Sequence, residues 1–156
     1  MARFAAETTT PVEKTRGEIE TVLYRYKATA FGYVRTSTAV TIMFEIADRR
    51  IRMVLPLPDP ADRRFHVAKV NQSAYAVRQL NKDQAHARWE QACRQAWRAL
   101  LLIVKAKLEA VDAGISTVER EFLADIVLPN GATVGEWTQP QIAATYARGD
   151  MPALLP

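Results

Sequence analysis

Apolar residues recur with helical spacing over one long stretch of the chain, from Asp83 to Gly114. At about 100° per residue, one side of this predicted helix collects a wide apolar set, namely Trp89, Cys93, Trp97, Leu100, Leu101, Val104, Leu108 and Val111. Three cations, Arg94, Arg98 and Lys105, fall within about 40° of one another directly beside that side. The pattern predicts a helix that forms the centre of the core and also carries a positive ridge.

The apolar spacing changes from 3.6 to 2 before this helix, which indicates strands joined by short turns. We expect three strands, over Ala30–Arg35, Ala39–Ala47 and Arg50–Leu57. One set of alternating side chains is apolar and suits packing on the long helix. The other set is expected to carry Arg35, Arg50 and Arg52 on the outer face of the sheet.

Helix start and stop signals frame the rest of the chain. Thr10 as N-cap, Pro11 and Glu13 predict a capping box and a first helix to about Lys27. Gly114 is expected to end the long helix as its C′ residue, with Ile115 making the usual hydrophobic contact.

The C-terminal part is predicted to hold smaller elements. Ser116 and Glu119 suggest a second capping box, opening a short helix whose inward residues are Val118, Phe122, Leu123 and Ile126. Asn130-Gly131 is a tight-hairpin signal. A last helix is expected to start at Thr138-Gln139-Pro140-Gln141, after a loop containing Trp137, and to end at Gly149. The apolar tail 151–156 is interrupted by prolines, so we expect it to pack on its own core or on a neighbour.

These elements predict an α+β fold: an N-terminal helix, a three-stranded antiparallel sheet packed on one long helix, then short helices and a small hairpin. One domain over residues 1–156 is expected, with a flexible lead at 1–9. Residues 59–82 lose the periodicity and read as a long basic loop with a short helix near Ala74 to Leu80. Its five cations, interleaved with Phe65, His66 and Tyr75, suit single-stranded nucleic acid. An exposed insertion explains the same loop equally well.

Charge is divided unevenly along the chain. Residues 1–113 hold 19 Lys and Arg against 12 Asp and Glu, a net charge of +7, and residues 114–156 hold 2 against 5, a net charge of −3. A basic body can attract nucleic acid, pair head to tail with a second copy, or simply be a solvated surface. The chain has no apolar run long enough for a membrane span and no signal-like start. With Cys93 as the lone cysteine, on the apolar helix face, we expect a cytoplasmic protein and a buried thiol.

Catalytic chemistry finds little support in the sequence. His66 and His86 have no partners at metal-ligand spacing, and no nucleophile motif or phosphate-binding glycine loop is present. Glu119, Glu121 and Asp125 form an acidic group that capping and solvation explain. No metal, cofactor or catalytic residue is therefore expected. Lys107 falls on the apolar side of the long helix, where its amine either reaches solvent or pairs with a carboxylate from another element.

Four strings carry a family resemblance: PVEKTRGEIE at 11–20, RRIRMVLPLP at 49–58, WEQACRQAWRALLLIVKAKLEAV at 89–111 and VGEWTQPQIAATY at 134–146. Together they resemble a family of small, uncharacterised bacteriophage and prophage proteins. The resemblance implies the cytoplasm of a bacterial host cell, and it brings no site residues. The element order is also similar to that of single-strand annealing proteins of recombination, which form rings or filaments on DNA.

Two hypotheses follow. The first is a non-enzymatic, phage-type protein that binds single-stranded DNA as an oligomeric annealing or recombination factor, using phosphate contacts. Its candidate nucleic-acid-binding residues are Arg35, Arg50, Arg52, Arg63, Arg64, Lys69, Arg94, Arg98 and Lys105. The second is a protein-interaction module, such as an inhibitor of host defence or a structural subunit.

Overall fold

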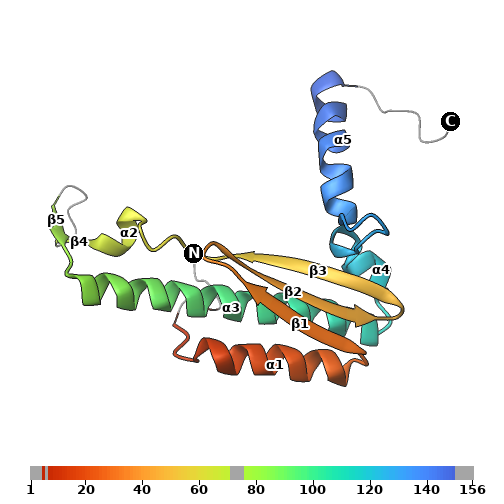
Figure 1. Cartoon of the computed structure of the whole chain (residues 1–156), viewed down its shortest axis with the longest axis horizontal. Coiled ribbons are helices and arrows are strands. Elements are labelled where there is room, and N and C mark those ends of the chain that lie inside the picture. The colour runs from red at the N-terminus through yellow and green to blue at the C-terminus, as the bar shows by residue number, and fades with distance from the viewer. Residues whose placement is uncertain (1–4, 6, 71–75, 150–156) are drawn as a thin grey trace.

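The computed structural model describes residue 5, residues 7–70 and residues 76–149. Its elements in chain order are α1 (Val12–Arg25), β1 (Ala30–Arg35), β2 (Ala39–Ile46), β3 (Arg49–Pro56), α2 (Arg63–His66), β4 (Val67–Lys69), β5 (Val77–Gln79), α3 (Lys82–Asp112), α4 (Val118–Glu121), the 3₁₀ helix η1 (Leu123–Asp125) and α5 (Val134–Arg148). The predicted α+β fold is confirmed (Figure 1).

The main sheet is antiparallel in the order β1-β2-β3. Phe44 of β2 lies opposite Phe31 of β1 and Ile51 of β3, which sets the register. Ala47 and Asp48 form the turn between β2 and β3, with φ angles of 49° and 56°. Positive φ at both central residues is typical of the type I′ turn that matches strand twist. The turn therefore takes Ala47, which the sequence had assigned to the strand.

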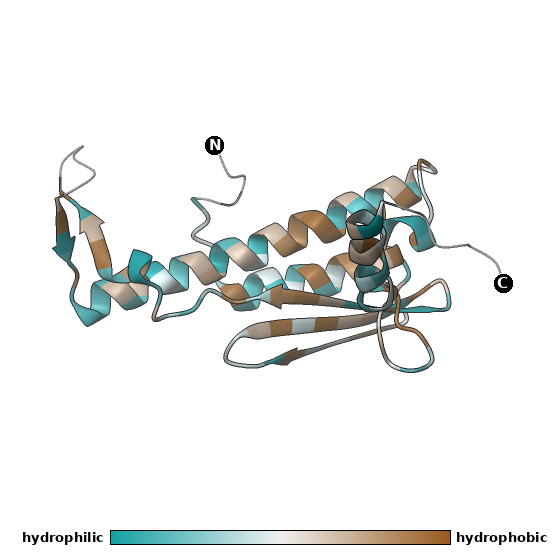
Figure 2. Ribbon diagram, turned by 90° about the horizontal axis from the view of Figure 1, so that it is seen from above, coloured by the Kyte–Doolittle hydropathy of each residue, from teal (hydrophilic) through white to brown (hydrophobic). Residues whose placement is uncertain are grey.

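The core lies between the sheet and a pair of helices. Figures 1 and 2 show α1 and α3 together on one side of the three strands. The core cluster joins Leu101, Val104 and Leu108 of α3 to the alternating apolar residues of β2 and β3. Phe122 is fully buried and meets Phe44 edge to face, with ring centroids 5.5 Å apart. No helix of the described residues covers the opposite face of the sheet, where Val34 and Val54 lie exposed (Figure 2).

Several helix starts differ from the predictions. Pro11 is the N-cap of α1 and no side chain caps this end, so the predicted capping box of Thr10 and Glu13 is wrong. Asn81 and Gln84 instead form a capping box at the start of α3, which extends it one residue upstream. Gly114 has the left-handed φ of 71° expected of a C′ residue. Ile115 is 79% exposed and does not make the expected contact.

The C-terminal elements also start earlier or later than expected. Thr117, rather than Ser116, caps α4, and Leu123 is 55% exposed instead of inward. The Asn130-Gly131 turn is closed by a single bridge between Val127 and Thr133. Thr133 and Glu136 form a capping box, so α5 begins at Val134, four residues before the predicted start, and includes Trp137 and Pro140. Gly149 ends α5 as predicted, with a φ of 74°.

Residues 59–70 and 76–82 contain regular structure. They form α2 and a small antiparallel hairpin of β4 and β5. The helix predicted near residues 74–80 is wrong, because residues 77–79 are the strand β5; residues 74 and 75 lie outside the described part. The apolar tail 151–156 lies outside it as well. Of the N-terminal lead, Ala5 is buried and the Thr8 carbonyl oxygen accepts a hydrogen bond from Gln91.

The long helix α3 has different structures at its two ends (Figure 1). At its start lie α2, β4 and β5; we call residues 59–70 and 76–88 the hairpin end. At its other end lie α4, η1 and α5, and α5 stands away from the sheet and the two long helices (Figure 1). Within the described ranges, no helix is both long and apolar enough to cross a membrane.

Candidate nucleic-acid interface

The nine cations predicted to bind nucleic acid lie in three separate places. Arg50 and Arg52 are on β3, on the outer face of the sheet. Four others, Arg35, Arg94, Arg98 and Lys105, lie at or beside the seam between α1 and α3. The remaining three, Arg63, Arg64 and Lys69, belong to the hairpin end. Whether a group is available to bind phosphate depends on the ion pairs and hydrogen bonds that its side chains already make.

The outer-face cations are both held in ion pairs. An Arg50 nitrogen lies 3.1 Å from a Glu45 carboxylate oxygen across the β2–β3 ladder. Arg52 donates to Glu136 of α5 at 2.6 Å and to the Gly131 carbonyl oxygen at 2.9 Å. Arg52 thus ties the sheet to the base of α5. Phosphate binding at these two positions would have to replace contacts that the protein already makes.

Arg35 does not lie on the outer face, so that prediction is wrong. It pairs with Val40, which is fully buried on the helix side of the sheet. Residues directly opposite each other in an antiparallel pair point to the same face. Arg35 accordingly shares a small pocket with Arg94 of α3 and Glu13 of α1. The alternation of faces along each strand was predicted correctly. The alternation alone does not show which residues of β1 share a face with the apolar residues of β2, because the β1–β2 register decides this.

The predicted positive ridge on α3 runs along α1. Arg98 forms an ion pair with Glu18 at 2.7 Å, and both side chains are about 30% exposed. Arg94 is half-buried and donates to the Gln91 side chain at 2.9 Å. Lys105 is exposed beside Tyr26, whose hydroxyl donates to Glu109 at 2.6 Å; this hydrogen bond raises the pKa of Tyr26. Part of the ridge therefore fastens α1 to α3.

Cations outnumber acids at the hairpin end. Six cations lie there, Arg63, Arg64, Lys69, Arg78, Lys82 and Arg88, against Asp59, Asp62 and Asp83. The sequence reading had not assigned Arg78, Lys82 and Arg88 to the site. The Asn81–Gln84 capping signal could have placed Lys82 and Arg88 at the start of the long helix, whereas Arg78 lies on a strand of three residues that gives no such signal.

Two of these six cations brace the hairpin end. Arg64 pairs with Asp62 at 3.1 Å and lies over the Phe65 ring, 4.7 Å from its centroid. Arg88 of α3 donates to the Val67 carbonyl oxygen at 2.8 Å. For Arg63, Lys69, Arg78 and Lys82, the described residues provide no acidic side chain at ion-pair distance.

Backbone contacts hold the hairpin end on α3. The Trp89 indole N–H donates to the Pro58 carbonyl oxygen at 2.8 Å. Phe65 is buried, so it is not available for base stacking, while Tyr75 lies outside the described residues. His66 hydrogen-bonds the Pro60 carbonyl oxygen at 2.9 Å. The sequence predicted that aromatic side chains of this loop stack on bases, and the buried Phe65 does not support that part of the prediction.

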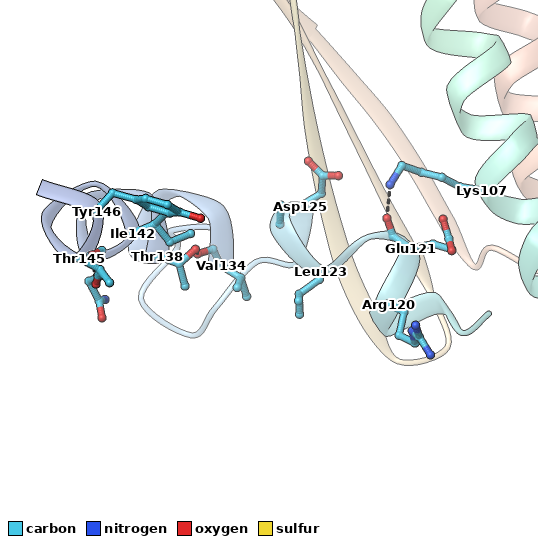
Figure 3. A pocket seen from close by; sticks show the side chains of 12 residues that line it. Lys107, Arg120, Glu121, Leu123, Asp125, Val134, Thr138, Ile142, Thr145 and Tyr146 are labelled. Atoms are coloured by element: carbon cyan, nitrogen blue, oxygen red, sulfur yellow. Dashed lines mark hydrogen bonds between the residues drawn. The ribbon is translucent and has the colours of Figure 1, made fainter. Parts of the chain in front are cut away.

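A groove of about 610 Å³ opens at the other end of the molecule, between α5 and the segment of α4 and η1 (Figure 3). We call it the α5 groove. Its walls are largely apolar, with Leu123 on one side and Ile142 and Tyr146 on the other (Figure 3). Lys107 lies at one edge, where its ammonium donates to the Glu121 carbonyl oxygen and approaches the Phe122 ring. Lys107 thus pairs with a backbone carbonyl oxygen rather than with a carboxylate.

Burial or an ion pair shapes the surroundings of Asp125, Cys93 and Glu119. Burial raises the pKa of Asp125, partly offset by the nearby Lys107. Cys93 is buried as predicted, and burial raises the pKa of its thiol, which makes it a packing residue. Glu119 pairs with Arg49 at 3.6 Å. Over the described ranges, no three His, Cys, Asp or Glu side chains gather where they could hold a metal ion.

Comparison with known proteins adds no relative: no family model, no curated protein and no solved structure matches the chain. Its function has to be inferred from its own residues.

Proposed function

We propose that this protein binds nucleic acid, in the first place single-stranded DNA, through phosphate contacts at the hairpin end. The observation that carries the proposal is the set of four cations that have no acidic partner among the described residues, Arg63, Lys69, Arg78 and Lys82, on a braced projection. Unpaired cations can bind phosphate without first giving up an internal ion pair. Such contacts release counterions and depend little on sequence.

The other predicted cations support this proposal less. Arg50, Arg52 and Arg98 already have carboxylate partners, and Arg35 lies on the helix side of the sheet. Replacing an internal ion pair with a phosphate contact gains little, because one charged contact is exchanged for another. The hairpin end is therefore the part of the nine-residue set that we assign to the interface.

A flexible strand suits the hairpin end better than a duplex does. The cations are spread over α2, β4, β5 and the start of α3, so a strand that bends can follow them. Duplex DNA has a persistence length of about 50 nm and would touch a narrow projection from one side only. Single-stranded DNA thus reaches more of the cations at once.

Strand annealing by a self-assembling phage protein is the more specific form of the proposal. The four family-like strings and the order of helix, three strands and long helix favour it. Annealing also needs assembly, since two strands have to be held together. Complementary oligonucleotides should anneal faster with the protein than without it, and its oligomers should grow in parallel.

Binding to labelled single- and double-stranded DNA across a salt series tests the proposal. Four phosphate contacts predict that affinity for a single strand falls about 50-fold between 50 and 200 mM salt. Binding to single strands should exceed binding to duplex of the same length. An absence of binding at 50 mM salt, or affinity that does not change with salt, would contradict the proposal.

A protein-interaction module is the second candidate, and the open sheet face favours it. Val34 is 53% exposed and Val54 is 55% exposed on that face, on either side of Thr41, and the partly exposed Met43 is the next residue of β2 on the same face. Exposed apolar patches of this kind are typical of binding surfaces. Association that persists after nuclease treatment and disappears in a Val34→Asp, Val54→Asp variant would support this candidate.

A further inference from the structure

The helix α5 projects from the rest of the protein with an apolar side uncovered (Figure 1). Gly135 is the one buried residue along its length, and its packing is mainly against η1. On the groove side, Ile142 is 52% exposed and Tyr146 is 86% exposed, facing Leu123 across the opening (Figure 3). A helix of 15 residues is marginal in water unless its apolar side packs against another surface. This side of α5 is therefore a candidate interface.

The shape of the α5 groove favours a second copy of the chain as its partner. The groove follows α5 from Val134 to Tyr146, about 18 Å along the helix axis. The α5 helix of another copy is a rod of matching length that carries the same apolar residues. When two such faces meet across a two-fold axis, the helix of each copy lies in the groove of the other, and both grooves are covered at once.

A carboxylate without a cationic partner lies at the base of the groove. Asp125 lines the groove from η1, which packs against α5 at Gly135. Its side chain is partly buried, and no cation of the described residues lies at ion-pair distance from it. The neighbouring Lys107 donates instead to the Glu121 carbonyl oxygen. Burial raises the pKa of Asp125, because the charged form loses solvent there. A cation brought by a partner would stabilise this charge.

The far end of α5 carries a suitable cation. Arg148 is exposed in the last turn, and the described residues provide no acidic side chain at ion-pair distance from it. Residue 141 is the midpoint of α5. In an antiparallel pair of helices centred there, Arg148 of the second copy lies opposite Val134, at the base where Asp125 lines the groove. A parallel pair would instead place the two Arg148 side chains together, so charge favours the antiparallel direction.

We propose that two copies of this protein form a symmetric dimer in which the α5 helices pack antiparallel, each in the α5 groove of the other copy, with Arg148 of one copy paired with Asp125 of the other. The dimer removes Leu123, Ile142 and Tyr146 from water and gives the partly buried carboxylate a cation. In a dilute sample, where the monomer predominates, Asp125 keeps its raised pKa. The inference does not rest on nucleic-acid binding, and the dimer is expected to form without DNA.

Sedimentation equilibrium of the full chain without DNA tests the dimer. Ile142→Asp places a charge in the middle of the proposed interface and should weaken the dimer at least about tenfold. Ile115→Asp is the matched control, because this side chain is 79% exposed and lies outside α5 and its groove. Both side chains are exposed in the single chain, so both variants should fold, which circular dichroism checks. A wild type that stays monomeric up to about 100 μM, or equal weakening in the two variants, would overturn the proposal.

A disulfide across the two-fold axis tests the direction and register of the helices. In a Cys93→Ala background, Gln141→Cys places one thiol per copy in the groove, opposite its own counterpart. Gln139→Cys is the matched control, since Gln139 is also exposed on α5 but does not line the groove. Under mild oxidation the Gln141→Cys variant should link two chains at least about tenfold faster than the control. Equal rates would contradict the antiparallel arrangement.

A double-mutant cycle tests the proposed ion pair between the copies. Arg148→Glu should weaken the dimer at least about fivefold, because it brings a second negative charge to Asp125. In an Asp125→Asn background the same change should weaken it by no more than about twofold. Equal losses in the two backgrounds would show that Arg148 and Asp125 do not pair.

Discussion

The two ends of α3 hold their charges in opposite ways. At the α5 end, Arg49 pairs with Glu119 and Arg52 pairs with Glu136, so cations there fasten one element to another. At the hairpin end, most of the cations have no carboxylate partner among the described residues, and backbone contacts do the fastening. One helix thus connects a charged surface and an apolar groove.

Phe122 anchors the α5 end in the core, and its removal should give the largest effect. Phe122→Ala leaves a cavity against Phe44 and should lower the free energy of unfolding by about 3–5 kcal/mol. Ile115→Ala is the control, because this side chain is 79% exposed and should change stability by less than about 0.5 kcal/mol. Urea unfolding measures both.

A small loss in Phe122→Ala, similar to that of Ile115→Ala, would mean that the α5 end is not anchored through this ring. Phe122→Leu should recover part of the lost stability, since it refills most of the cavity with apolar volume.

Gly135 controls how closely α5 approaches η1. A Cβ at this position would lie 2.9 Å from the Ala124 carbonyl oxygen, so Gly135→Ala should destabilise the protein by about 1–3 kcal/mol. Gly17→Ala is the opposite case: nothing lies within 4 Å of a Cβ there, inside α1, and stability should rise by about 0.5–1 kcal/mol. Thermal unfolding of the two variants separates the effects by sign. Equal signs would contradict the close packing of α5.

Asp125 should give the smallest effect, and it depends on pH. Below its ordinary pKa of 3.8 the carboxyl is protonated in the folded and unfolded states, and its burial costs little. As pH rises through the raised pKa of the folded state, a buried charge develops and stability is lost. In the Asp125→Asn variant, the free energy of unfolding should therefore rise by up to about 0.5 kcal/mol at pH 7 and should not change near pH 3. A gain at pH 3 that disappears at pH 7 would have the wrong sign.

Periodicity was enough to predict the centre of the molecule. Most of the predicted apolar positions of α3, β2 and β3 lie in the core cluster, because burial demands period 3.6 in a helix and period 2 in a strand. Trp89 and Cys93, near the start of α3, lie outside that cluster. Gly114 and Gly149 were also correct helix ends, since a left-handed backbone position favours glycine. In both cases the residues that decide the structure lie next to one another in the sequence, so the pattern could be recognised there.

The ends of the molecule were less predictable because their structure depends on strand pairing and ion pairs between residues that are far apart in the sequence. Arg35 was assigned to the wrong face, since the β1–β2 register and not the strand spacing places it. Thr138 looked like a helix start, yet the Thr133–Glu136 capping box begins α5 upstream. Residues 59–82 lack periodicity because strands of three residues are too short to show one. Whether a cation pairs with an acid depends on partners as distant as Arg52 and Glu136.

The most direct test of the division between the two ends compares two triple variants of equal charge. Arg63, Lys69 and Arg78 replaced by Ala remove unpaired cations of the hairpin end, and Arg50, Arg52 and Lys105 replaced by Ala remove cations elsewhere. At 150 mM salt, where charges beyond about 8 Å are screened, the first variant should bind single-stranded DNA at least about tenfold more weakly than the wild type. The second should stay within about threefold. Equal losses, or a larger loss in the second variant, would contradict the assignment of nucleic-acid binding to the hairpin end.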